Sequence, residues 1–224
     1  MAMIFGADSI QPVNTELTNG YDLFTWVMRK NGIPSFWCRN ISGTSAVTAE
    51  EAEFLHRKKT KIALIFNDLT ERGVSSADGT NDAIRLIQAA KALGVPDDNG
   101  VALFAAIDGN WSVSHNWMTT FSSMLAGFGY VPGFIGNTDS SKNCSFDREC
   151  GHFLQATEEV GHFGTVYGAT EPKREGEPAE WEPFSPSDLT REQIALWYSG
   201  TIACNDAPVS AVYGRNESVL EYLW

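Results

Sequence analysis

The sequence lacks several features that would assign it to a class at once. Its 224 residues contain no run of about 18 apolar residues, so we expect no membrane insertion. Basic residues are scarce: 16 Lys and Arg stand against 28 Asp and Glu, which gives a formal net charge of -12. An acidic surface repels phosphate groups, so this balance argues against nucleic acid as a partner and against adsorption to anionic lipid.

Cysteine is also scarce, and no CxxC pair occurs among Cys38, Cys144, Cys150 and Cys204. Cys144 and Cys150 could close a small disulfide loop, although idle thiols are the simpler interpretation. The same two cysteines with His152 and His162 match no standard zinc spacing, so we expect no metal site. Dinucleotide-binding, phosphate-loop, GxSxG and HExxH motifs are absent as well, and we expect no cofactor.

The sequence does contain a repeated order of elements. Eight short runs rich in Val, Ile and Phe end in polar residues, as expected for strands of a parallel sheet covered on both faces. We expect these strands at 4–8, 35–40, 61–68, 101–108, 131–138, 164–170, 193–199 and 211–216.

Helix signals separate most of these runs. Thr48 and Glu51 form a capping-box pattern that opens a helix to about residue 58. Gly94 ends a helix predicted over 81–93. Further helices are expected at 21–30 and 115–128, and a weaker one at 145–160, where Gly151 interrupts the pattern.

Strands alternating with helices at this chain length favour a mixed α/β fold, a single (β/α)₈ TIM-type barrel, slightly degraded, over residues 1–224. A doubly wound sheet is the alternative, but it needs fewer strands and a phosphate-binding turn. Residues 172–191 form an acidic segment with four prolines. We expect a long loop at the barrel mouth here, because too little chain follows for a second domain.

Catalytic groups of such barrels lie at the carboxyl ends of the strands, and the predicted ends are polar here. Acids and amides that bind sugar hydroxyls stand beside aromatic rings that stack on sugar faces. Capping of helices and packing in the core are the structural alternatives for each residue. The candidate site consists of Asp8, Arg39, Asn67, Asp108, Trp111, Asn137, Asp139, Tyr167, Glu171, Trp197 and Asn216.

Several of these stretches together resemble a known family. The similar segments are Phe5–Ser9, Phe36–Asn40, Asp78–Asp108, Gly129–Asn137 and Leu196–Ser199. They resemble a bacterial glycoside-hydrolase-like family, long known as domain of unknown function 1906, that is related to the glycoside hydrolase family 25 lysozymes. The resemblance implies a barrel that acts on bacterial cell-wall peptidoglycan.

The related lysozymes carry an Asp on the first strand and an Asp-x-Glu motif on the fourth. Asp8 matches the first position. If Asp108 holds the Glu position of the motif, its partner has become Ala106; if it holds the Asp position, the Glu has become Asn110.

The resemblance implies a lysozyme-like muramidase in which Asp108 acts as general acid and Asp8 supports it. Glycoside hydrolysis usually uses two carboxylates, but a substrate acetamido group can replace one of them as nucleophile. The alternative is a catalytically inactive barrel that binds carbohydrate or cell wall. The expected partner is a glycan and the expected state a monomer. The first ten residues show no signal peptide, and a secreted or cell-wall location is favoured, since a leader could have been removed.

Overall fold

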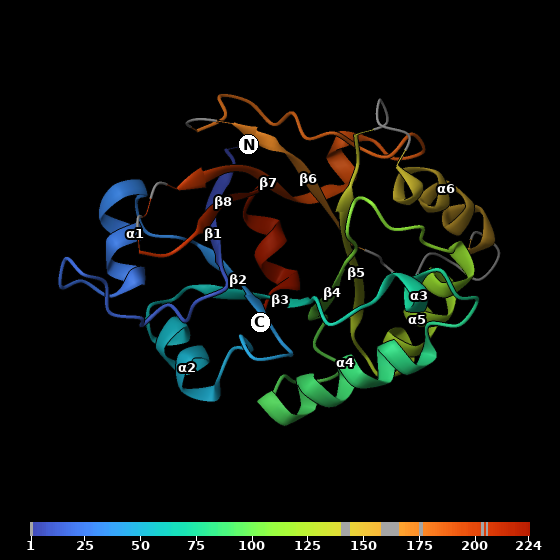
Figure 1. Ribbon diagram of the computed structural model, residues 1–224, viewed down its shortest axis with the longest axis horizontal. Helices are drawn as coiled ribbons and strands as arrows, with labels where there is room; N and C mark the ends of the chain where they lie inside the picture. The colour runs from blue at the N-terminus through green and yellow to red at the C-terminus, as the bar shows by residue number, and fades with distance from the viewer. Residues whose placement is uncertain (1, 140–143, 158–165, 175–176, 203, 205) are drawn as a thin grey trace.

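The computed structural model describes residues 2–139, 144–157, 166–174, 177–202, 204 and 206–224, with backbone alone at 166 and 170–174. In this part of the chain eight strands form one closed barrel, in the order of the sequence (Figure 1). The strands are β1 (Ile4–Ser9), β2 (Phe36–Asn40), β3 (Lys61–Phe66), β4 (Ala102–Ala106), β5 (Val131–Asn137), β6 (Val166–Arg174), β7 (Ile194–Ile202) and β8 (Val209–Gly214). A mixed α/β barrel and all eight predicted strands are therefore confirmed.

Strand β8 departs from the expected parallel arrangement. Strands β1 to β7 pair in parallel, whereas β8 is antiparallel to both β7 and β1, with Ile4 opposite Gly214 and Asp8 opposite Ser210. Only residues 203–208 connect β7 to β8. A parallel crossover needs about a dozen residues or more, so this short connection forces a hairpin.

The helices cover the outside of the barrel around β1 to β5. They are α1 (Leu23–Asn31), α2 (Ala49–Arg57), α3 (Glu71–Val74), α4 (Thr80–Leu93), α5 (His115–Gly127) and α6 (Ser145–Thr157). Figure 1 shows α1 and α2 on one side of the barrel and α4 to α6 on the other. Among the described residues, no helix has the length and apolarity needed to cross a membrane.

The predicted helices are confirmed, and α3 is an addition. Thr48 accepts a hydrogen bond from the Glu51 amide, as predicted for the start of α2. Gly94 ends α4 in the left-handed conformation. Position 151 inside α6 has no room for a side chain, because a Cβ there would lie 1.9 Å from the Asp188 carboxylate.

An extended segment takes the place of helices over the outside of β7 and β8. In Figure 1 this segment, coloured orange, runs past β6 and β7. The ring of Trp181 packs edge-on against outward-facing Trp197, with centroids 5.6 Å apart, and its Nε1 donates to the Arg191 carbonyl. Burial and then the Glu177 carboxylate raise the pKa of Tyr213 on β8 to about 12.

The expected mouth loop over 172–191 is thus corrected in two respects. Strand β6 continues to Arg174. The segment from Glu177 to Trp181 then lies against Ala2 and Met3, which precede β1, and so lies toward the opposite end of the barrel from the mouth. Covering the outer wall of β7 and β8 supplies the apolar contacts that helices supply elsewhere.

The barrel interior is packed and is closed at one end. Phe36 and Phe104 fill it because Gly6 and Gly133 on the adjacent strands leave room; a Cβ at either glycine would lie within 2.6 Å of the facing ring. The C-terminal 3₁₀ helix η3 (Glu217–Tyr222), red at the centre of Figure 1, closes the amino-terminal end of the barrel. The carboxyl ends of β1 to β7 are left to form a site.

Candidate functional site

A small pocket lies at the carboxyl ends of the parallel strands. Its volume is about 270 Å³, close to the lower limit of about 300 Å³ for ligand pockets. Apolar side chains form part of its wall and polar groups the remainder. The lining residues are Asp8, Ser9, Ile10, Asn40, Ile65, Asn67, Ala106, Ile135 and Tyr198.

Asp8 is the acidic group of this pocket. It is the sole carboxylate among the described lining residues, and its strand neighbours are Cys38 on β2 and Ser210 on β8. Burial raises the pKa of Asp8 from 3.8 to about 6, although the positive charge of Arg39 acts in the opposite direction. Asp8 can therefore hold and release a proton near neutral pH.

Two uncharged groups, Cys38 and Tyr198, lie near Asp8. Cys38 faces the barrel interior and hydrogen bonds with Tyr198, which lines the pocket. Burial and the Asp8 charge raise the pKa of the Cys38 thiol and of the Tyr198 phenol well above their usual ranges. Both groups keep their protons, so neither supplies a charge that would compete with a ligand.

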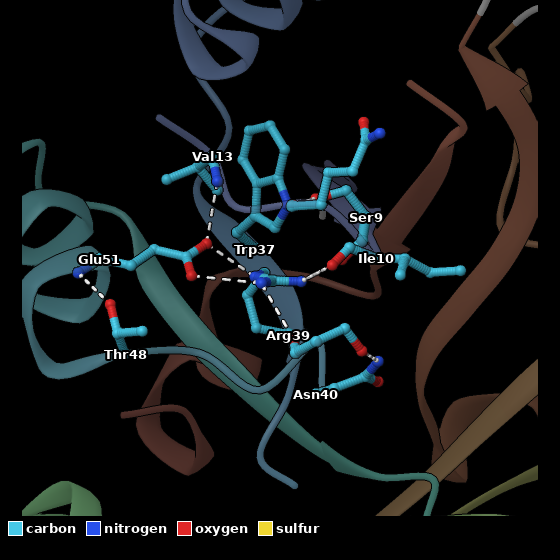
Figure 2. Close-up of polar contacts among 10 residues, drawn as sticks. Ser9, Ile10, Val13, Trp37, Arg39, Asn40, Thr48 and Glu51 are labelled. Carbon is cyan, nitrogen blue, oxygen red and sulfur yellow. Dashed lines mark hydrogen bonds and ion pairs between the residues drawn. The ribbon is translucent and has the colours of Figure 1, made fainter. Parts of the chain in front are cut away.

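Arg39 lies on the other face of β2, outside the pocket. It is fully buried, and its Nε and one terminal nitrogen donate to the two carboxylate oxygens of Glu51 on α2, at 2.7 and 3.2 Å. The remaining donors reach the backbone carbonyls of Ser9, Ile10 and Ser45 (Figure 2).

This arrangement corrects the expected substrate-binding role of Arg39. All five of its N–H groups are used within the chain, and none points toward the pocket. Glu51 also accepts from the Val13 amide at 2.9 Å, so the pair ties the segment after β1 to the segment after β2 (Figure 2). Arg39 is a positioning residue for the pocket rim.

Asp108 is exposed and does not line the pocket. Its Oδ1 accepts from the amide and side-chain nitrogens of Asn110 at 2.8 and 3.2 Å, which closes a local turn. The structure therefore does not bring Asp108, the expected general acid, into the described pocket that contains Asp8. Gly109, the residue after Asp108, packs against Asn137. The predicted site residues Asp108 and Asn137 therefore lie at neighbouring strand ends.

Both aromatic candidates on strands point away from the pocket. Trp197 faces outward onto Trp181. Tyr167 is buried outside the barrel, where it hydrogen bonds with Cys150 of α6. Trp111 is half-buried against the outer core. None of these three rings lines the described pocket, so the predicted stacking platform is not assembled there.

Of the remaining candidates, Asn67 alone lines the described pocket. Asn67 is exposed and lines the pocket, whereas Asn137 accepts from the amide of buried Asp139 at 3.0 Å, after β5. Glu171 lies in β6, and its side chain is outside the described residues. Asn216 lies at the other end of the barrel, because β8 is antiparallel; there it accepts from the Ser218 amide and begins η3.

Sequence reasoning missed four residues at the mouth. Ser9, Asn40 and Tyr198 line the pocket, and Ser210 lies beside Asp8. The signal for two of them was the alternation of faces along a strand: Asn40 and Tyr198 line the pocket, while their chosen neighbours Arg39 and Trp197 face outward. Ser210 required the direction of β8.

The four cysteines form no disulfide in the part of the chain that the structure describes. Among these described residues, Cys144 is not joined to Cys150, so the small-loop alternative is not found. Cys38 and Cys150 are buried thiols. His162 lies outside the described residues, and among the residues that the structure describes Cys144 and Cys150 do not belong to the group of possible metal ligands that contains His152.

Comparison with known proteins shows the fold and leaves the activity open. The chain is similar to an uncharacterized B. stearothermophilus protein, with 23% identity and a TM-score of 0.81 over 99% of this chain and 100% of that one. A Tat-secreted protein of Mycobacterium tuberculosis, solved in complex with HEPES, shares 13% identity and a TM-score of 0.57 over 93% and 94% of the two chains. No family model and no curated protein matches the chain.

Proposed function

We propose that the protein is a TIM-type glycoside-hydrolase-like barrel that binds bacterial cell-wall glycan at the mouth pocket, with Asp8 as proton donor in cleavage of a glycosidic bond. The observation that carries the proposal is the position of Asp8: a partly buried carboxyl with a pKa of about 6 in a pocket at the carboxyl ends of the strands. The resemblance to the glycoside-hydrolase-like family supports the choice of substrate class.

The acid role passes from Asp108 to Asp8 in this proposal. A general acid must be protonated in the resting state, and burial favours that form for Asp8. Asp108 is exposed and engaged in its own turn with Asn110. Its proposed part is limited to contacts with glycan that extends beyond the pocket.

The chemistry can proceed with one protein carboxyl. Asp8 gives its proton to the glycosidic oxygen as the bond to the anomeric carbon breaks. The carbonyl oxygen of the substrate's own acetamido group attacks that carbon and forms a cyclic intermediate. Water, deprotonated by the Asp8 carboxylate, then opens the intermediate and restores the starting proton.

Neutral polar groups complete the proposed site. Asn67 and Tyr198 line the pocket and supply its neutral polar side chains, and Ile135 offers an apolar surface to a ring face. The pocket volume suits a single sugar ring, with neighbouring rings over the rim. Secretion of the M. tuberculosis neighbour accords with a wall substrate, which lies outside the cell membrane.

A binding barrel without turnover is the second candidate. It is favoured by the presence of a single carboxylate among the described lining residues of the pocket. Most glycosidases use two. In this case the pocket would hold a glycan end, and Asp8 would accept or donate a hydrogen bond.

The test compares purified bacterial cell walls treated with the wild type, Asp8→Asn and Asp108→Asn. We expect soluble muropeptide release by the wild type, loss of at least a hundredfold in Asp8→Asn, and release within a few-fold of wild type in Asp108→Asn. Sedimentation of protein with the walls measures binding in the same samples. Binding without release by the wild type establishes the second candidate, and absence of both contradicts the proposed function.

A further inference from the structure

Outside the mouth, three metal-ligating side chains converge between α5 and α6. His115 is the first residue of α5, and Glu149 and His152 lie one turn apart on α6. Oε2 of Glu149 lies 2.9 Å from Nδ1 of His115 and 3.3 Å from Nδ1 of His152. One ligand atom from each residue lies within 4.8 Å of the others.

We propose that His115, Glu149 and His152 form a binding site for a divalent transition-metal ion, with Zn²⁺ as the preferred ion. Two imidazoles and one carboxylate are a common zinc ligand set. With metal–ligand bonds of about 2.0–2.1 Å, ligand atoms in a tetrahedron lie about 3.3 Å apart. The separation from Glu149 to His152, 3.3 Å, equals this value, and that to His115, 2.9 Å, needs a small opening of the pair. The inference rests on no step of the proposed function.

The carboxylate is oriented by a neighbour that leaves the relevant oxygen available. Nε of Arg148 donates to Oε1 of Glu149 at 3.0 Å, while Oε2 faces the two imidazoles. In metal sites, hydrogen bonds from neighbouring residues to a ligating side chain fix its orientation. Arg148 thus favours one rotamer of Glu149, the one that the ion requires.

The two helices are also held in place without the ion. The Ser145 hydroxyl at the start of α6 accepts from the Val113 amide at 3.0 Å, just before α5 begins. The imidazoles approach edge to face, with centroids 5.4 Å apart. Ligands on two fixed elements lose little freedom when the ion binds.

Three protein ligands and partial exposure to solvent are consistent with a four-coordinate ion that keeps one position open. The side chain of Glu149 is 13% exposed, while those of His115 and His152 are 34% and 51% exposed. Solvent can therefore reach the ion and provide the fourth ligand. A bound ion would join α5 to α6 and fix the start of α5, next to the loop that contains Asp108.

Calorimetric titration of the metal-free protein with Zn²⁺ tests this inference. We expect one ion per chain in the wild type and at least a tenfold loss of affinity in each of His115→Gln, Glu149→Gln and His152→Gln. Two variants are controls: His56→Gln removes an exposed histidine on α2, and Cys204→Ser removes a partly exposed thiol. Both are expected to bind as the wild type does.

Thermal unfolding without metal shows whether each variant folds. Added Zn²⁺ is expected to raise the unfolding midpoint of the wild type and of both controls, and to leave the midpoints of the three ligand variants unchanged. Co²⁺ gives a second readout, because its visible spectrum reports four-coordinate nitrogen and oxygen ligands. No stoichiometric binding by the wild type would overturn the inference. So would affinity unchanged in the three ligand variants, or lost equally in Cys204→Ser.

Discussion

Ser210 lies directly opposite Asp8 across the antiparallel pair of β8 and β1. The start of β8, and not its end, therefore stands at the mouth of the barrel. This direction places a hydroxyl beside the acidic group of the pocket and moves Asn216 to the opposite end. One reversed strand thus determines which residues of the last quarter of the chain can contact a ligand.

The pairing predicts the effect of a second acid beside Asp8. Side chains of directly opposed residues in an antiparallel pair have Cβ atoms about 4.5–5.5 Å apart, so Ser210→Asp places a like charge at close range. We expect the pKa of Asp8 to rise above its value of about 6. Carboxyl NMR titration measures the shift, with exposed Ser123→Asp on α5 as control. An equal effect of the two substitutions would contradict the pairing.

Asp8 should also reduce the stability of the protein at neutral pH. The pKa of Asp8 is raised from 3.8 in the unfolded chain to about 6 in the fold. The free energy of unfolding is therefore not reduced by Asp8 below pH 3.8, where the carboxyl is protonated in both states, and it falls as pH rises through 6. We expect Asp8→Asn to be more stable than wild type at pH 7 by about 1–3 kcal/mol, with the difference gone near pH 3.

Urea unfolding at both pH values measures this difference. Asp108→Asn is the matched control, because Asp108 is exposed, and its effect should stay within about 0.5 kcal/mol. A destabilised Asp8→Asn variant at pH 7 would show that the ionised carboxylate is well solvated or paired in the fold.

The neighbours Trp197 and Tyr198 should separate stability from ligand binding. Trp197 is fully buried outside the barrel, so Trp197→Ala is expected to lower the free energy of unfolding by about 3–5 kcal/mol while cell-wall binding by the folded protein is unchanged. Tyr198→Phe removes the hydroxyl of a pocket-lining residue and should weaken wall binding about three- to tenfold. Unfolding curves and sedimentation with walls test the pair, and the reverse pattern would contradict the assignment of faces.

Substitution of one buried residue of the Arg39–Glu51 pair is expected to cause a large loss of stability. Glu51→Ala leaves the Arg39 guanidinium buried without its carboxylate and the Val13 amide without its acceptor, so we expect a loss of about 3–5 kcal/mol. Glu53→Ala on the same helix breaks an exposed pair with Arg57 and should cost less than about 1 kcal/mol. Similar losses in the two variants would show that the buried pair has no special role.

The architecture could be predicted from sequence because apolar runs and helix caps are local signals. The strand at Lys61–Phe66 and the helix that Gly94 ends are examples. The direction of β8 depends on loop length. The predicted strands 193–199 and 211–216 leave 11 residues between them, at the limit for a crossover, whereas the observed strands leave only residues 203–208.

The site was harder to predict because adjacent strand residues face opposite sides of the barrel wall. Arg39 and Trp197 are polar or aromatic at the right height in the barrel, but they face the helices and the covering segment. Their neighbours Asn40 and Tyr198 face the pocket. His115 and Glu149 are 34 residues apart, and a contact between two helices carries no signal in sequence spacing.

A titration of the Asp8 carboxyl by ¹³C NMR in the wild-type protein tests most directly whether Asp8 can act as proton donor, with Asp8→Asn used to assign its signal. We expect a midpoint at about pH 6, because burial opposes ionisation at the mouth of the barrel. A midpoint near 3.8 would mean that Asp8 is an ordinary ionised carboxylate, and it would contradict the role of Asp8 as proton donor.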